Sequence, residues 1–248
     1  MLIVGGCTDA ATTTTTTIAA PITTTSATVP ATPTTTATTT TTDPYALAPG
    51  QSLVAHADAE LAVYDSPVAA APAQTLPATT ILGTPQAYLV LDGPIDNWTL
   101  LALPGRPNGA TAWAKTDDLR FEIVDQQITV DLSDRNLTFV SGGEELINAT
   151  VAVGSNSNPT PVGRFFVTDV VQLSNPNSAW GPFAVGLSGR SDTITEFNGG
   201  DGIIGIHGTN RPNTIGQPVS LGCVRLDNES ITLLANTIRL GVPVRIEA

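Results

Sequence analysis

Basic residues are scarce in this chain, and charged residues of either sign are few. Of 248 residues 13% are charged, and 10 Lys and Arg against 22 Asp and Glu give a formal net charge of −12. Lys115 is the only lysine. Binding to nucleic acid and to anionic lipid headgroups depends on clustered basic residues. The composition therefore excludes nucleic acid as a partner and argues against direct adhesion to a membrane surface.

Long apolar runs are missing, and cysteine is scarce. No run reaches the ~20 apolar residues that a membrane-spanning helix needs. The two cysteines, Cys7 and Cys223, are 223 − 7 = 216 positions apart. A disulfide between them would consume the thiol of Cys223, whose sequence surroundings favour chemistry. We therefore expect two unpaired cysteines with different roles.

A glycine-rich stretch from Ile203 to Leu226 holds residues that are rare elsewhere in the chain. It contains His207, one of two histidines, and Cys223, which follows 223 − 207 = 16 positions later. A free thiol with a pKa near ~8.5 is only partly ionised at neutral pH, and a nearby histidine can take its proton. Glycine before the cysteine, as at Gly222, allows backbone N–H groups to point at one oxyanion. The stretch predicts a cysteine nucleophile with a histidine base; the alternative is a buried apolar cysteine and a structural histidine.

Three segments resemble the L,D-transpeptidase (YkuD) catalytic domain. The most specific one is His207-Gly208-Thr209 followed by Ser220-Leu221-Gly222-Cys223-Val224-Arg225-Leu226. Thr160 to Phe165 and Trp180 to Val185 resemble two further elements of that family. The resemblance covers roughly residues 121–247. Many members carry His where this chain has Leu221, and this departure leaves the preference for the acceptor open.

The resemblance implies a peptidoglycan acyltransferase. Cys223, deprotonated by His207, would attack a tetrapeptide stem at its third-position diamino acid and release D-alanine. The acyl group would then pass to a neighbouring stem as a 3→3 cross-link. Its partners would be donor and acceptor stem peptides, together with carbapenem-type inhibitors, and no metal or organic cofactor is needed. An L,D-carboxypeptidase, in which water takes the acyl group, and a non-catalytic wall-binding protein remain the alternatives.

Other site residues follow from the same resemblance. The backbone carbonyl of Gly208 would orient the histidine, Ser220 would shape the site, and Gly222 would lie in the oxyanion region. Arg225 and Thr209 are expected to bind substrate. A guanidinium suits a carboxylate bidentately, and peptidoglycan stems carry many carboxylates.

The N-terminal part indicates a location outside the cytoplasm. Residues 1–7 resemble the end of a bacterial lipoprotein signal, which would make Cys7 a lipidation site; an incidental thiol is the alternative. Residues 8–49 are a Thr-rich tract without charge between Asp9 and Asp43. Such composition is typical of a disordered stalk. We expect an enzyme of the cell wall or periplasm, with a lipid anchor as its only link to the membrane, and a role in cell wall biogenesis and cell shape.

The remaining chain is predicted to be mostly β, in two domains. Residues 50–119 have short apolar runs between turn residues, and Trp98, Pro107-Asn108-Gly109 and Trp113 resemble a bacterial Src-homology-3-like β-barrel. His56 in this region is interpreted as structural. Residues 120–248 are predicted to form the β-sandwich-type catalytic domain, whose first strand is 121–124. Its one main helix is expected from Asn228 to Arg239, where apolar residues recur at helical spacing.

Overall fold

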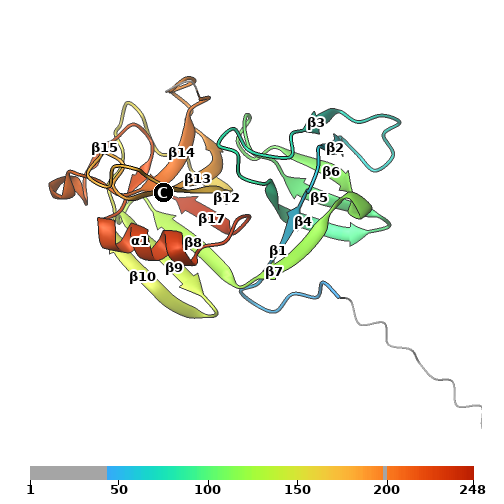
Figure 1. Ribbon diagram of the computed structural model, residues 1–248, viewed down its shortest axis with the longest axis horizontal. Helices are drawn as coiled ribbons and strands as arrows, with labels where there is room; N and C mark the ends of the chain where they lie inside the picture. Colours follow the sequence, from blue (N-terminus) through green and yellow to red (C-terminus); the bar gives the residue numbers. More distant parts are fainter. Residues whose placement is uncertain (1–43, 198–199) are drawn as a thin grey trace, which may run out of the picture. The chain divides into compact units, whose positions relative to one another are not determined.

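Two main β-sheets and one α-helix make up the part of the chain that the computed structural model describes, residues 44–197 and 200–248 (Figure 1). The prediction of a mostly β protein with a single main helix is confirmed. Cys7 and residues 8–43 of the predicted stalk lie outside the described residues. Residues 44–49 contain no helix or strand. In residues 44–197 and 200–248, no helix is both long and apolar enough to cross a membrane.

The first sheet has seven strands over Ser52–Val124. Their bounds are β1 (Ser52–His56), β2 (Leu61–Tyr64), β3 (Gln74–Leu76), β4 (Ala87–Ile95), β5 (Trp98–Ala102), β6 (Thr111–Lys115) and β7 (Arg120–Val124), with the 3-10 helix η1 (Thr116–Asp118) before β7. The strand order is β3-β2-β6-β5-β4-β1-β7. Trp98 is half-buried and packs edge-on against Tyr64, with ring centroids 5.0 Å apart. The similarity of this unit to a Src-homology-3-like domain stays a prediction.

The strand at 120–124 belongs to the first sheet, whereas the sequence placed 121–124 at the start of the catalytic domain. β7 pairs antiparallel with β1 along its whole length, from Ser52 opposite Val124 to His56 opposite Arg120. Hydrogen bonding to a strand far away in sequence decides this assignment, and the apolar pattern of β7 itself carries no information about its partner. The change of sheet therefore falls after Val124.

The second sheet has eight strands and carries the C-terminal half of the chain. Its strands are β8 (Gln126–Asp131), β9 (Asn136–Ser141), β10 (Glu144–Thr150), β12 (Gly163–Gln172), β13 (Phe183–Arg190), β14 (Ile203–His207), β16 (Val224–Arg225) and β17 (Pro243–Glu247). Their order is β10-β9-β8-β17-β12-β13-β14-β16. β11 (Val153–Gly154) and β15 (Pro218–Ser220) form a separate parallel pair, and η2 (Pro212–Thr214) is a 3-10 turn. A hairpin joins β9 and β10, and Gly142 and Gly143 supply its two positive φ angles of 61° and 81°.

The helix α1 (Asn228–Thr237) covers part of the second sheet (Figure 1). It begins where predicted, because the Asp227 carboxylate accepts hydrogen bonds from the backbone N–H groups of Glu229 and Ser230. Ile231 and Leu234 are fully buried in the same core as β8, β12 and β14. The helix thus anchors the chain directly after the motif that contains Cys223.

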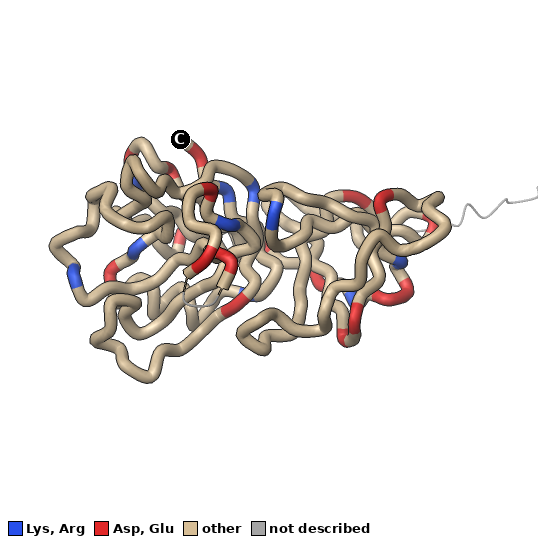
Figure 2. The backbone as a smooth tube through the Cα atoms, turned by 90° about the horizontal axis from the view of Figure 1, so that it is seen from above, with Lys and Arg blue, Asp and Glu red and all other residues tan. Residues whose placement is uncertain are grey.

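The two sheets share core residues and polar contacts. Val54 of β1 belongs to the core of the second sheet, and Phe166 of β12 belongs to the core of the first. The Asn108 side chain exchanges two hydrogen bonds of 2.8 Å with the backbone N–H and carbonyl of Arg190. Glu122 accepts from both His56 and Arg239, which gives His56 a structural role. Figure 2 shows basic residues interleaved with acidic ones along the described chain.

Candidate active site

His207 is the last residue of β14, which is held by a strand on each side. Ala184 of β13 lies opposite it in antiparallel pairing, and Arg225 of β16 lies opposite it in parallel pairing. Imidazole Nδ1 is 2.6 Å from the carbonyl oxygen of Gly208. Since a carbonyl oxygen can only accept, Nδ1 carries the proton and donates it. The lone pair of Nε2 is therefore available to accept a proton from another group.

The imidazole of His207 lies in an apolar environment that favours its neutral form. Its ring centroid is 4.4 Å from that of Trp180, with 40° between the planes. Burial lowers the pKa of His207 to about 4; the hydrogen bond with Gly208 raises it, and the charge of Arg225 lowers it further. At neutral pH the imidazole is uncharged and can act as a base.

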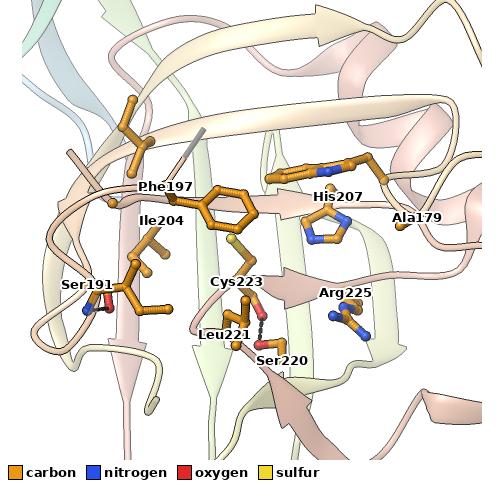
Figure 3. Close-up of a pocket in the computed structure, with 13 residues that line it drawn as sticks. Ala179, Ser191, Phe197, Ile204, His207, Ser220, Leu221, Cys223 and Arg225 are labelled. Carbon is orange, nitrogen blue, oxygen red and sulfur yellow. Dashed lines mark hydrogen bonds between the residues drawn. The ribbon is translucent and has the colours of Figure 1, made fainter. Parts of the chain in front are cut away.

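Cys223 carries a free thiol directly before β16 and is partly exposed. Burial raises its pKa, against the opposing influence of a backbone hydrogen bond with Gly205 and of the charge of Arg225. Figure 3 shows Cys223 and His207 projecting into one pocket, with the Phe197 ring beside the sulfur. At neutral pH the pocket thus contains a neutral thiol and a neutral imidazole.

Ser220 fixes the short loop that presents Cys223. Its Oγ donates a 2.5 Å hydrogen bond to the Cys223 carbonyl and accepts a 3.1 Å bond from the Gly222 N–H. Gly222 adopts a φ of 118°, a conformation that favours glycine. Because the Gly222 N–H donates to Ser220, it is not a free donor for an oxyanion. In the described part of the chain, the Cys223 N–H has no hydrogen-bond partner, so this group is the candidate oxyanion donor.

Arg225 places an unpaired cation at the same pocket. Its Nε is buried without a hydrogen-bond partner. Among the ion pairs of residues 44–197 and 200–248, none includes Arg225. An unpaired buried charge is unfavourable, so an anionic group of a ligand would stabilise this guanidinium.

Thr209 supports the histidine loop and does not line the pocket. Its N–H donates to Asn228 Oδ1 at 2.8 Å, and its Oγ1 accepts from the Arg211 N–H at 2.9 Å. Gly208 and Gly181 allow this packing, because a Cβ at Gly208 would lie 2.4 Å from Asn228 Oδ1 and one at Gly181 only 2.7 Å from the Gly208 Cα. The contacts tie the N-terminus of α1 to the residue whose carbonyl orients His207.

The pocket itself has a volume of about 160 Å³ and mostly apolar walls (Figure 3). It brings together four of the residues predicted from the sequence, His207, Cys223, Ser220 and Arg225. The other lining residues are Ala179, Trp180, Ser191, Ile194, Phe197, Gly202, Ile203, Ile204 and Leu221. Trp180 lies in the segment Trp180 to Val185, which resembles an element of the family, whereas no feature of the sequence indicated Ile194 or Phe197 as pocket residues. No cluster of three or more His, Cys, Asp or Glu that could hold a metal ion occurs among the described residues.

Comparison with known proteins gives matches to one family. The family model described as the YkuD L,D-transpeptidase catalytic domain matches residues 125–246. A proposed L,D-transpeptidase of Bacillus subtilis (strain 168), YkuD, is 27% identical over 146 residues, which are 59% of this chain and 73% of that protein. Its counterpart from Bacillus licheniformis is 30% identical over 125 residues, 50% of this chain and 67% of that protein.

Solved structures give distant matches. An L,D-transpeptidase from Mycobacterium smegmatis matches with 16% identity and a TM-score of 0.40, over 65% of this chain and 90% of that chain. Bd1075 from Bdellovibrio bacteriovorus matches with 26% identity and a TM-score of 0.38, over 49% of this chain and 47% of that chain. From the family model and the curated relatives, the chain belongs to the L,D-transpeptidase (YkuD) family.

Proposed function

We propose that this protein is a peptidoglycan L,D-transpeptidase that uses Cys223 as its nucleophile. The observation that carries the proposal is the fixed tautomer of His207. Nδ1 donates its proton to the Gly208 carbonyl, so Nε2 remains as a proton acceptor. His207 lines the pocket that also contains the Cys223 thiol. A neutral imidazole with an oriented second nitrogen is what general-base activation of a thiol requires.

The first half of the reaction forms a thioester. The Cys223 sulfur attacks the carbonyl of the third stem residue, its proton passes to His207 Nε2, and the carbonyl oxygen becomes an oxyanion near the Cys223 N–H. Collapse of the tetrahedral intermediate breaks the carbon–nitrogen bond. The imidazolium returns its proton to the leaving amine, and D-alanine departs.

The second half restores the thiol. The amine of a neighbouring stem attacks the thioester, gives its proton to His207 and forms a new amide as the sulfur leaves. The sulfur then takes the proton back. Arg225 would hold a stem carboxylate, because its buried Nε lacks a partner within the described chain. Since stem peptides lie in the wall, we propose an extracytoplasmic site of action, with Cys7 as the lipidation site.

Product analysis tests this function. The full chain is incubated with a disaccharide-tetrapeptide, and products are separated by mass spectrometry. A cross-linked dimer with release of D-alanine is expected, and Cys223→Ala should give none. A free tripeptide without dimer would instead identify an L,D-carboxypeptidase, and an unchanged substrate would contradict both activities.

A further inference from the structure

One wall of the catalytic pocket comes from residues that follow β13 and precede β14. Four of these residues line the pocket, and we call them the β13–β14 wall: Ser191, Ile194, Phe197 and Gly202. Figure 3 shows the Phe197 ring of this wall beside the sulfur of Cys223. The position of the wall therefore determines how much space an acyl donor finds next to the thiol.

A segment of the first sheet, between β5 and β6, is attached to β13. The Gly105 N–H donates a 3.0 Å hydrogen bond to the Ser188 carbonyl. The Asn108 side chain exchanges two hydrogen bonds of 2.8 Å with the backbone of Arg190. Arg106 lies between these two points of attachment. Its backbone is therefore held next to the second sheet, so less conformational entropy is lost when its side chain reaches across.

The guanidinium of Arg106 connects the two ends of the wall. Its Nη2 donates to the Ile194 carbonyl at 3.2 Å and to the Asp201 carbonyl at 3.1 Å. Ile194 belongs to the wall, and Asp201 directly precedes the wall residue Gly202. The two carbonyls are 201 − 194 = 7 positions apart in sequence. A charged donor forms stronger hydrogen bonds than a neutral one, so this bridge holds the two ends together.

Gly202 lies at the point where these groups meet. It has a φ of 74°, a conformation that favours glycine. A Cβ at this position would lie 2.0 Å from the Ile194 carbonyl oxygen and 3.3 Å from Arg106 Nη2. The absence of a side chain thus lets the Ile194 carbonyl approach the start of β14 and lets the guanidinium reach both carbonyls from one place.

We propose that Arg106 is a positioning residue of the active site, which holds the β13–β14 wall where the acyl donor binds. The inference rests on the proposed function for the identity of that donor. Arg106 touches neither the thiol nor the imidazole in any hydrogen bond or ion pair of the described residues, so its effect is on the geometry of the pocket. A misplacement of about 1 Å can slow an enzyme about 100-fold. The first sheet thereby contributes to the pocket of the second.

Full-length Arg106→Ala is expected to remain folded. The Ser191 N–H still donates its 2.8 Å hydrogen bond to the Gly202 carbonyl, and Arg190 Nε still lies 2.6 Å from Asp201 Oδ1. Because Arg106 is exposed, we expect a melting temperature within about 4 °C of the wild type.

Hydrogen exchange tests the bridge without any chemistry. Full-length wild type and Arg106→Ala are compared with Lys115→Ala, which also removes one exposed positive charge from the first sheet. In Arg106→Ala, amides in residues 189–197 are expected to exchange about fivefold faster, because a local contact is lost. Amides in residues 126–141, on β8 and β9, should not change. Equal exchange of residues 189–197 in Arg106→Ala and the wild type would overturn the proposal.

Two reactions of the same thiol separate a positioned pocket from a reactive sulfur. Arg106→Ala is expected to lower the second-order rate constant for acylation by a tetrapeptide stem about tenfold, the scale of one hydrogen bond from a charged group. Alkylation by iodoacetamide, a small reagent followed on the peptide that contains Cys223, should keep its rate. The pH midpoint of acylation should also stay unchanged, because His207 is not affected. Lys115→Ala should match the wild type in both reactions.

A conservative variant and the remaining outcomes complete the test. Arg106→Lys keeps a charged nitrogen with several N–H donors and should recover part of the acylation rate. Unchanged acylation in Arg106→Ala, or an equal loss in acylation and alkylation, would overturn the proposal. Absence of an acyl-enzyme in the wild type would contradict the proposed function, and hydrogen exchange would still decide whether Arg106 holds the wall.

Discussion

Replacement of Asn108 by alanine is expected to destabilise the protein and to disturb the pocket wall. The Asn108 amide donates a 2.8 Å hydrogen bond to the Arg190 carbonyl and accepts one of 2.8 Å from the Arg190 N–H. A third, longer bond of 3.3 Å reaches Asp192. Arg190 is 8% exposed, so the lost partners are replaced only in part by water.

The size of this effect follows from the bonds lost. Each net hydrogen bond contributes about 0.5–1.5 kcal/mol, and a buried group left unpaired costs about 1–3 kcal/mol. The expected loss is therefore about 2–4 kcal/mol. In a protein of this size that corresponds to a fall in melting temperature of roughly 5–15 °C.

Chemical and thermal denaturation of the full chain measure the loss. Asn177→Ala is the control, because the Asn177 side chain makes no hydrogen bond within the described chain, and it should change stability by less than about 0.5 kcal/mol. Below its melting temperature, Asn108→Ala should also acylate more slowly, since Arg190 precedes the pocket residue Ser191. A stability equal to that of the control would show that the contact between the two sheets is energetically unimportant.

Four further predictions concern the active site. The pKa of His207 is about 4 in the folded chain and about 6.5 in the unfolded chain, so the unfolded chain binds more protons between these pH values. His207 therefore lowers the free energy of unfolding as pH falls through this window, by about 3 kcal/mol at pH 4. His207→Gln should flatten the pH dependence of the free energy of unfolding, measured by urea denaturation. Acylation of the wild type should fall only as pH drops toward 4, and a midpoint near 6.5 would contradict the buried neutral imidazole. Ser220→Ala should slow acylation of Cys223 about tenfold or more while leaving binding unchanged, because the loop loses two hydrogen bonds; equal rates by intact-mass kinetics would rule this out. Gly208→Ala should reduce activity and stability together, since a Cβ would lie 2.4 Å from Asn228 Oδ1, and a fully active, stable variant would refute that packing.

The local sequence pattern was sufficient to predict those elements that are determined by interactions between residues close together in the sequence. The helix followed from the helical spacing of apolar residues such as Ile231 and Leu234. Ser141-Gly142-Gly143 between two apolar runs is a hairpin signal in the sequence, and the β9–β10 hairpin turns there. The candidate pair of His207 and Cys223 followed from a motif in which glycines and reactive side chains occur at fixed spacing.

Features that depend on contacts between distant segments were not predictable. β7 joined the first sheet because β1 is its partner, and its own sequence contains no sign of that choice. Phe197 reaches the pocket through the fold of the chain between β13 and β14.

The central claim is that Cys223 is the nucleophile, and covalent labelling of the full chain by a carbapenem tests it most directly. Its strained amide is expected to acylate an activated thiol, so intact mass should rise by one drug mass, on the peptide that contains Cys223. The peptide that contains Cys7 serves as the internal control and should carry no drug mass. Cys223→Ala should show no adduct and no turnover of tetrapeptide. If Cys223→Ala still releases D-alanine at the wild-type rate, the thiol is not the nucleophile and the proposed mechanism is wrong.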